Sequence, residues 1–421
     1  MLKIFQRIHM AMLYPFAFTV VFLQSTRAWY KALGKKPKIH FEAEYAGQRI
    51  MLLALYEKGV LRPDVIRLLQ AARAAGLYVL AVNTLKLRDP ESLRGLADCY
   101  IERPNFGRDF GSYKTGFLHL AKRGWDKTCP RLLMLNDSIY FSEDRLPKFI
   151  DDMMGSDIEV LGSTENYEIE YHLGSFCIAM AGSILRNALF RKYWRQYRLT
   201  DVRPLVILRG EMRLSRTLKR CVSAPSEFSA LYGTSRFLTA LRNDPSLADF
   251  TIRNRRTSDL TGWKRLSPEF IYKFVQDRFF MPVYGTRDLE VSIESQLEEL
   301  NQNVYVNGVE DFRNLLERHL VEGSTMETEK LHSLTVALLT EIFMDGSQIH
   351  QNPTVLLKLG LPIVKLDGLY RGMFNIFDIE NIVRQMTPAE REELQRLLLE
   401  RPYGGTTLIG WKRAAFMRGL I

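Results

Sequence analysis

Polar and charged residues that could bind a phosphorylated ligand are concentrated between residues 103 and 141. The segment begins with a charged turn that contains two glycines, Asn105-Phe106-Gly107-Arg108-Asp109-Phe110-Gly111. About twenty residues later, the apolar run 132–135 ends at Asn136-Asp137-Ser138. Ligands in open α/β sheets bind at the carboxyl ends of strands and at helix N-termini, and this segment supplies both. It predicts one side of a ligand site; the alternative is a strand that ends in an Asx turn, with Asp137 capping the next element.

Three side chains, two of them in this segment, have the chemistry that binding of a phosphorylated ligand needs. A carboxylate at a strand end, such as Asp137, is a hard oxygen ligand for a divalent cation (Mg²⁺ or Mn²⁺) that bridges a diphosphate. The guanidinium of Arg108 matches the geometry of a phosphate, although Arg108 and Asp109 could equally form an ion pair that fixes the turn. Lys365 could reach a phosphate from the C-terminal part of the chain, or could be a solvated lysine.

Transfer of a group to a hydroxyl also needs a general base. Glu211 is the first candidate, because it follows Gly210 and precedes a helical pattern; the alternative is a first-turn carboxylate favoured by the helix dipole. His172 is the second candidate, as a base or as a ligand of a metal or a diphosphate, although a lone histidine is more often structural. Polar residues at strand ends and in the turn complete the predicted donor site: Tyr56, Asn83, Asn105, Gly107, Asp109, Asn136 and Ser138.

Alternating strands and helices predict the scaffold that positions these residues. Short apolar runs bounded by glycines or polar residues predict strands at 49–56, 77–82, 98–101, 132–135, 158–162 and 176–180. Helical spacing predicts helices from Pro63 to Gly76 and over 112–123. This alternation is typical of an α/β protein with a Rossmann-type, mostly parallel sheet.

The chain beyond residue 185 is predicted to be largely helical. Helical patterns cover 187–197, 287–319 and 327–344, and a capping box at Thr387 opens a helix that reaches about residue 400. The polar, basic stretch 242–268 is predicted to be a loop or a boundary. We therefore expect three parts: an N-terminal helical segment (1–36), an α/β domain that contains the ligand site (37–225), and a mainly helical C-terminal region (226–421).

Composition and charge restrict the partners. A 421-residue chain with 46% hydrophobic and 25% charged residues is globular, and its formal net charge is +10. This charge fits an anionic membrane surface or phosphorylated substrates, whereas no zinc-finger spacing or RNA-binding motif supports nucleic acid. Four dispersed cysteines suggest neither a disulfide framework nor a metal site.

The N-terminal segment contains an apolar run, residues 10–23, with lysine and arginine on both sides. Spanning a bilayer takes roughly 20 apolar residues, so this run is short. Three alternatives remain: a helix that lies on an anionic membrane surface, a helix docked on its own protein, and a true span.

Several short motifs in order resemble the rhamnan synthesis protein F family. The first is N-x-G-R-D-x-G-S-Y-K (105–114), followed by the apolar strand and Asn136-Asp137-Ser138. The others are His172-Leu173-Gly174-Ser175-Phe176, the aromatic helix Phe190 to Trp194, Val206-Ile207 with Gly210-Glu211 and Leu214-Ser215, Asn352-Pro353-Thr354, and Gly360-Leu361-Pro362-Ile363-Val364-Lys365. The similarity covers roughly residues 48–222 and 350–387.

That resemblance implies a bacterial glycosyltransferase with a GT-A-like fold, in which residues 37–225 bind the nucleotide sugar and residues 226–421 complete the acceptor side. The implied reaction moves a sugar, rhamnose from dTDP-rhamnose in the first instance, to a lipid-linked polysaccharide or lipopolysaccharide acceptor, at the cytoplasmic face of the inner membrane and with a peripheral attachment. It also implies that Asp109 binds the nucleoside or sugar, and that Glu211 lies where inverting GT-A enzymes carry their acidic base. Asn136-Asp137-Ser138 departs from the usual D-x-D, so basic residues could replace a metal at the leaving diphosphate. Two alternatives from other classes are a non-catalytic scaffold of a polysaccharide-assembly complex and a peripheral membrane adaptor.

Overall fold

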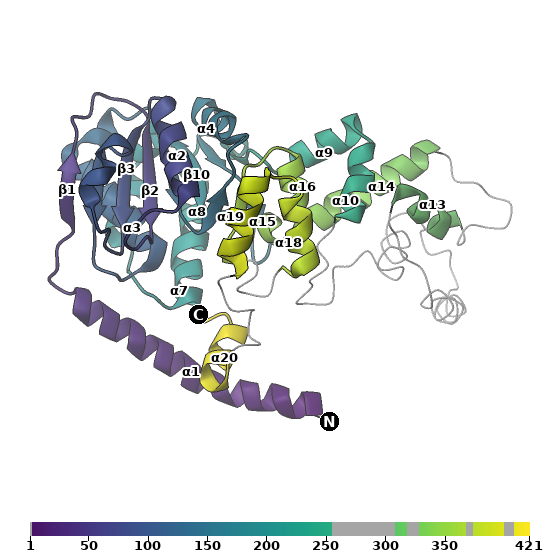
Figure 1. Ribbon diagram of the computed structural model, residues 1–421, viewed down its shortest axis with the longest axis horizontal. Coiled ribbons are helices and arrows are strands. Elements are labelled where there is room, and N and C mark those ends of the chain that lie inside the picture. The colour runs from purple at the N-terminus through teal and green to yellow at the C-terminus, as the bar shows by residue number, and fades with distance from the viewer. Residues whose placement is uncertain (1, 255–307, 318–327, 368–373, 400–407) are drawn as a thin grey trace.

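An eight-stranded sheet forms the centre of the computed structural model, which describes residues 2–254, 308–317, 328–367, 374–399 and 408–421 (Figure 1). The strand order is β1-β4-β3-β2-β5-β10-β7-β11. The strands are β1 (Lys38–Glu42), β2 (Ile50–Leu55), β3 (Tyr78–Asn83), β4 (Cys99–Glu102), β5 (Arg131–Asn136), β7 (Val160–Gly162), β10 (Cys177–Ala181) and β11 (Phe228–Ala230). Only β1 and β10 run antiparallel to their neighbours. The predicted α/β class with a mostly parallel sheet is therefore confirmed.

Helices cover both faces of the sheet, which explains why its central strands are continuous apolar runs. Met51, Leu53 and Leu55 of β2 pack into the same core as α2 (Pro63–Ala74) and α4 (Leu146–Gly155). The alternate residues of β2 face the opposite core, with α3 (Arg108–Arg123) and α6 (Ala188–Gln196). In register, Leu53 lies between Ala81 of β3 and Leu135 of β5. The carboxyl ends of β2, β3, β4 and β5 consequently meet at one edge of the sheet.

The predicted strands and the helix after Pro63 are present, and the differences concern boundaries and short elements. Helix α3 begins at Arg108, four residues before the predicted start. The first part of the stretch 242–268, up to residue 254, is helical and not the predicted loop. It contains the end of α9 (Thr234–Asn243) and all of α10 (Ser246–Arg253). Helix α10 buries Leu247, Ala248 and Ile252. Its helical pattern was not recognised in the sequence because polar residues surround these three. The remainder of that stretch, 255–268, lies outside the described residues. So does most of the predicted helix 287–319, of which α13 (Val309–Glu317) is described.

The C-terminal region attaches beside the end of β5. Strand β6 (Ile139–Phe141) follows β5 almost directly and pairs antiparallel with β12 (Ile363–Lys365). Tyr140 of β6 then packs among residues of α16 (Pro353–Lys358), α18 (Ile376–Val383) and α19 (Pro388–Leu399). Helix α14 (Thr328–Met344) packs on α9 and confirms the helix predicted over 327–344. The sheet itself continues past residue 225, because β11 belongs to it.

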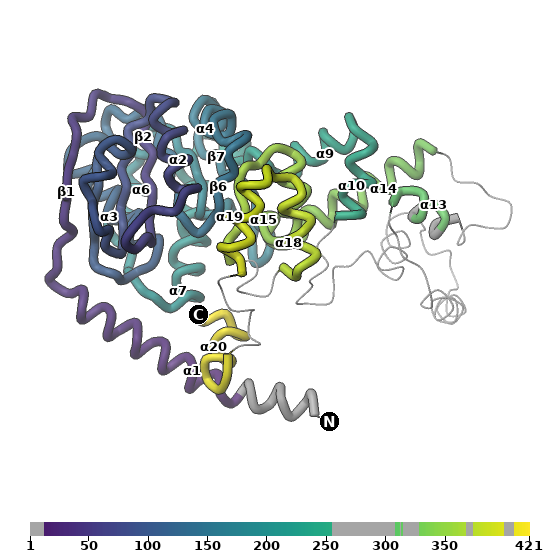
Figure 2. Tube along the Cα trace, viewed as in Figure 1, coloured from purple at the N-terminus to yellow at the C-terminus, as the bar shows by residue number. Residues whose placement is uncertain are grey.

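The N-terminal segment forms one helix, α1 (Leu2–Ala32), which lies below the α/β layers beside α20 (Gly410–Met417) (Figure 2). Ala17 and Val21 of α1 are buried with Val202 and with residues of α20. Within the described part of the chain, no helix has both the length and the apolar character that a membrane crossing requires. One face of α1 is therefore docked on the rest of the protein, which was one of the three alternatives for this segment.

Candidate active site

A cavity of about 720 Å³ opens at the carboxyl edge of the sheet, between this edge, the segment 164–176, the segment 201–212 and the C-terminal region. Most of the predicted site residues line it. These are Tyr56, Asn105, Arg108, Asp109, Asn136, Ser138, His172, Glu211 and Lys365. We call this cavity the cleft. Residues that are distant in sequence thus meet in one place, as expected for strand ends that share a sheet edge.

The charged turn at the start of α3 has an unusual backbone. Gly107 adopts φ +93°, and Arg108 follows with φ +48°, the only positive φ of a non-glycine residue in the described part of the chain. A left-handed conformation costs an ordinary residue roughly 1–2 kcal/mol, so the surrounding structure must impose it. The amide of Gly107 donates to Asp201 Oδ1 over 2.7 Å, and Arg108 Nε donates to the carbonyl of Asp201 over 3.0 Å. Such strain is typical of ligand-binding turns.

Arg103, which was not among the predicted site residues, stabilises this turn through hydrogen bonds to its backbone. Its buried guanidinium donates to the carbonyls of Pro104 and Phe106, over 2.9 and 2.6 Å, and to the carbonyl of Arg108. Burial lowers the pKa of Arg103 to about 10, which leaves it protonated at neutral pH. A side chain at Gly111 would collide with this guanidinium at 2.7 Å, which explains the second glycine of the turn.

A chain of hydrogen bonds connects the turn to the end of β5 and to the C-terminal region. Asn136 Nδ2 donates to Asp109 Oδ2 over 3.1 Å, and Asn136 Oδ1 accepts from the hydroxyl of Ser138 over 2.6 Å. Lys365 Nζ donates to the same Ser138 hydroxyl over 2.7 Å and lies 4.8 Å from the centre of the Phe176 ring. The polar residues that end β5 therefore orient a carboxylate and an ammonium at the wall of the cleft.

The two predicted general bases face each other. His172 is buried, and its Nδ1 donates to the carbonyl of Glu170 over 2.7 Å, which directs Nε2 to Glu211. His172 Nε2 and Glu211 Oε2 are 3.9 Å apart, and the Glu211 side chain is 31% exposed. Glu211 is thus the more accessible of the two, with His172 behind it.

Glu211 lies on a π-helical turn, Ile207–Met212, between α7 (Arg203–Val206) and α8 (Arg213–Lys219). Such turns are rare, and they occur frequently at functional sites. The hydroxyl of Tyr193 donates to the carbonyls of Arg209 and Gly210, both at 3.3 Å, which ties α6 to this turn. A Cβ atom at Gly210 would lie 2.8 Å from the Phe110 ring, so the turn packs closely against α3.

Asp137 does not line the cleft. Its Oδ2 accepts from the amide of Tyr56 over 2.5 Å, and its carbonyl accepts from Arg62 over 2.9 Å. Burial raises the pKa of Asp137 to about 7; the Tyr56 amide and Arg62 oppose this shift, and Glu57 adds to it. Two further predicted residues lie behind the wall. Asn83 hydrogen-bonds both main-chain groups of Glu57, and Gly107 contributes its backbone.

The opposite wall contains residues that sequence reasoning missed. His350 Nε2 lies 2.9 Å from Asp367 Oδ1, and His350 Nδ1 lies 3.0 Å from the Ser347 hydroxyl. Burial favours the neutral form of Asp367, but the positive charges of His350, Lys365 and Arg203 keep its pKa well below the usual range. Asp367 therefore remains ionised. The available signal in the sequence was its position two residues after Lys365, just beyond the motif 360–365.

The residues at Asp137 fit a divalent cation poorly. This carboxylate already accepts the Tyr56 amide, and the neighbouring Asn136 oxygen accepts from Ser138. Among the described residues, the group whose atoms are close enough to hold a metal is Glu42, Cys99 and His119. These three lie at the amino end of β4, at the opposite edge of the sheet, and Glu42 is also paired with Arg123 at 2.7 Å. Neither observation supports a metal in the cleft, and metal binding at Asp137 stays a prediction.

Comparison with known proteins supports the resemblance that the motifs indicated. The chain is 26% identical to the uncharacterized protein y4gN of Sinorhizobium fredii over 198 residues, which are 46% of this chain and 50% of that protein. It is 33% identical to the virulence protein VirA of Vibrio anguillarum over 122 residues, which are 28% of this chain and 38% of that protein. The chain thus matches half or less of the length of these relatives.

A family model matches residues 77–244. This segment contains the turn at Arg108, the end of β5, His172 and Glu211, and it extends 22 residues beyond the limit of 222 that the motifs suggested. Residues 48–76 and 350–387 lie outside it. The segment that builds most of the cleft matches the rhamnan synthesis protein F family, which is concerned with polysaccharide synthesis, and the resemblance is confirmed there.

Proposed function

We propose that the chain is a glycosyltransferase that moves a sugar from a nucleotide diphosphate donor to an acceptor hydroxyl in the cleft. One observation carries this proposal. The cleft places cations that suit a diphosphate, Arg108 and Lys365, in the same cavity as a Glu211–His172 pair that suits a general base. A sugar transfer needs both groups at once, whereas a scaffold needs neither.

In the proposed reaction, the acceptor oxygen attacks the anomeric carbon of the donor sugar. A new carbon–oxygen bond forms while the bond between this carbon and the diphosphate breaks, and the electron pair leaves with the diphosphate. Glu211 takes the proton of the acceptor hydroxyl, and His172 holds Glu211 in place. Arg108, Lys365 and Arg203 stabilise the charge that develops on the leaving group, which is electrostatic catalysis by preorganised cations.

The finer assignments come from the family resemblance. The first donor to test is dTDP-rhamnose, and the acceptor class is a lipid-linked polysaccharide or lipopolysaccharide at the cytoplasmic face of the bacterial inner membrane. Asp109 is assigned to the nucleoside or sugar because it lies in the cleft beside Asn136. Because the residues at Asp137 fit a divalent cation poorly, no step of the proposed reaction is assigned to a metal, and adding EDTA to the assay tests this part separately.

Incubation of the full chain with a panel of nucleotide sugars, followed by detection of released nucleoside diphosphate, tests the function. We expect one donor to raise the melting temperature and to be hydrolysed slowly without an acceptor. A non-catalytic scaffold would show no thermal shift with any nucleotide diphosphate. A peripheral adaptor would bind vesicles equally well after replacement of Glu211 and Arg108. Either result, without turnover, would overturn the proposal.

A further inference from the structure

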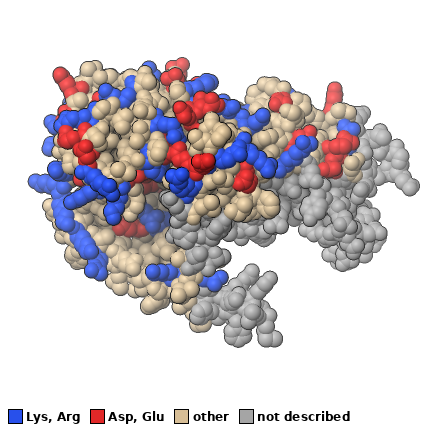
Figure 3. Space-filling model, in the orientation of Figure 1, with Lys and Arg blue, Asp and Glu red and all other residues tan. Residues whose placement is uncertain are grey.

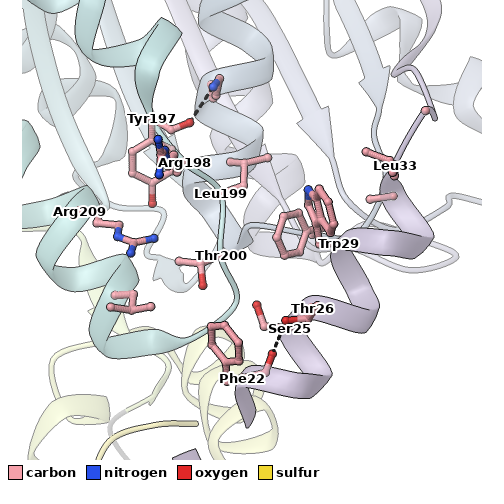
Figure 4. Close-up of a pocket in the computed structure, with 15 residues that line it drawn as sticks. Phe22, Ser25, Thr26, Trp29, Leu33, Tyr197, Arg198, Leu199, Thr200 and Arg209 are labelled. Carbon is pink, nitrogen blue, oxygen red and sulfur yellow. Dashed lines mark hydrogen bonds between the residues drawn. The ribbon is translucent and has the colours of Figure 1, made fainter. Parts of the chain in front are cut away.

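A second cavity lies between α1 and residues 197–209 (Figure 4). Its volume is about 590 Å³. Phe22 and Trp29 of α1 and Leu33, which follows it, form one wall, and Leu199 and Arg209 belong to the other. In Figure 4, Phe22 and Trp29 point from α1 towards the segment that carries Leu199 and Thr200. We call this space the α1 cavity.

Two polar side chains in the α1 cavity lack partners. Tyr197 is 5% exposed, yet within the described residues nothing hydrogen-bonds to its hydroxyl. Arg209 is half-buried, and its guanidinium forms no hydrogen bond or ion pair with the rest of the described chain. A buried polar group without a partner is destabilising, so such groups are rare in folded proteins. A hydroxyl and a guanidinium beside each other are the donors that a phosphate group needs.

The α1 cavity also has a large apolar wall beside its polar lining, which a small anion alone would not require. Phe22 and Trp29 remain 49% and 42% exposed, and they lie seven residues apart on one stripe of α1. Phe16, Leu23 and Tyr30 form a neighbouring stripe with the same spacing, and these side chains are exposed as well. Contiguous apolar surface of this kind marks a binding site for an apolar partner. The cavity therefore matches a ligand with an anionic head and a hydrocarbon chain.

We propose that the α1 cavity binds a lipid phosphate, with the phosphate at Arg209 and Tyr197 and the chain along α1. The cavity adjoins the cleft. Arg209 lines the cavity, whereas Arg203, Ile207 and Glu211 of the same segment line the cleft. The lipid phosphate is the lipid end of the acceptor, whose saccharide reaches Glu211. The assignment to the acceptor rests on the proposed function, but the binding of a lipid phosphate does not.

Calorimetric titration of the full chain with farnesyl phosphate, without any donor, tests this site independently of turnover. We expect saturable binding, and much weaker binding of inorganic phosphate, which lacks the chain. Dihexanoylphosphatidylglycerol, a short-chain phospholipid, should bind more weakly than farnesyl phosphate. Equal affinity for the phospholipid would overturn the assignment to the acceptor, and absence of farnesyl phosphate binding would overturn the site itself.

The Tyr197→Phe variant gives the sharpest test, because it removes only the unpartnered hydroxyl. The melting temperature of the free protein should be unchanged or higher, while the affinity for farnesyl phosphate should fall by about tenfold. Arg209→Gln should weaken binding at least as much. Lys192→Gln, on the exposed side of α6, is the matched control and should bind normally. Equal affinities in Tyr197→Phe and in the control would contradict the proposal.

Discussion

At the scale of single residues, the central assignment is Glu211 as the general base. Removal of such a base typically lowers the rate by about 10²–10⁴. Glu211→Gln is nearly isosteric, so we expect turnover to fall by that amount while the dissociation constant of the donor changes little. Glu168→Gln, an exposed carboxylate of the same cleft, is the control and should retain turnover. Normal turnover of Glu211→Gln would exclude the role, and lost donor binding would place Glu211 at the nucleotide instead.

A second residue-scale prediction concerns Asp137 and pH. Its pKa is about 7 in the folded protein, against an ordinary value of 3.8. Folding therefore favours the protonated form. This contribution to the free energy of unfolding is complete below about pH 3.8, declines as the pH rises, and is lost above about pH 7. Asp137→Asn stays neutral throughout, so its melting temperature relative to the unmodified protein should rise between pH 5 and pH 8. A difference that does not vary with pH would show that Asp137 is ionised in the fold.

The same variant tests the predicted role of Asp137 in donor use. If this carboxylate binds a metal or the donor, Asp137→Asn should abolish transfer and keep its fold. Transfer near the original rate would mean that Asp137 serves only to hold the Tyr56 amide. The pH dependence of the melting temperature and the rate of transfer are independent measurements, since the first is made without any ligand.

At the scale of elements, the π-helical turn determines where Glu211 lies. Gly210→Ala would bring a methyl group to 2.8 Å from the Phe110 ring, and such overpacking typically costs about 1–3 kcal/mol. We expect a lower free energy of unfolding and a turnover reduced beyond that loss, because Glu211 moves away from His172. Leu208→Ala, which is exposed on the same turn, should change neither quantity. Urea unfolding and steady-state kinetics on both variants check this, and full activity of Gly210→Ala would contradict it.

The strands and helices also show which parts of the fold and of the site could be predicted from the sequence. Continuous apolar runs such as 50–55 and 132–135 are typical of strands that helices cover on both sides, so the sheet was predictable. Since parallel strands share one edge for their carboxyl ends, the convergence of Tyr56, Asn136 and Arg108 was predictable too. The pairing of β6 with β12 was not, because three-residue strands about 220 residues apart have no local signal. The place of His350 and Asp367 in the cleft depends on such contacts and was therefore missed. The bonds of Arg103 are local, but nothing in the sequence shows that its guanidinium is buried behind the turn.

At the scale of the whole molecule, Lys365 makes the cleft depend on the C-terminal region. Lys365→Gln removes the ammonium that bonds Ser138, so the dissociation constant of the donor should rise by about tenfold or more. The melting temperature should change little, because β12 still pairs with β6. Arg384→Gln, an exposed position of the same region, is the control. Titration with the nucleoside diphosphate measures both, and equal affinities would remove Lys365 from the donor site.

A second whole-molecule prediction concerns attachment to membranes. Exposed Lys31, Lys35, Lys36 and Lys38 gather at the C-terminal end of α1, within the basic surface at the lower left of Figure 3. Each adds about 1 kcal/mol of attraction to an anionic surface, and salt screens this term. We expect the full chain to sediment with anionic vesicles and to be partly released by high salt, while residues 37–421 stay folded and unbound. Resistance to both salt and alkali would instead indicate a spanning segment, and unfolding after truncation a purely structural helix.

The packing of α1 on α20 has a consequence for the time course of synthesis. Helix α1 is made well before its partner α20 and before the strand that carries Lys365. At about 5–20 residues per second, translation from the end of α1 to α20 takes roughly 20–75 s. During that interval, Val202 can already pack on α1, but Ala414 and Ala415 cannot yet cover it. A nascent chain therefore exposes more of α1 to its surroundings than the finished protein does, and this is still so when Lys365 has been made.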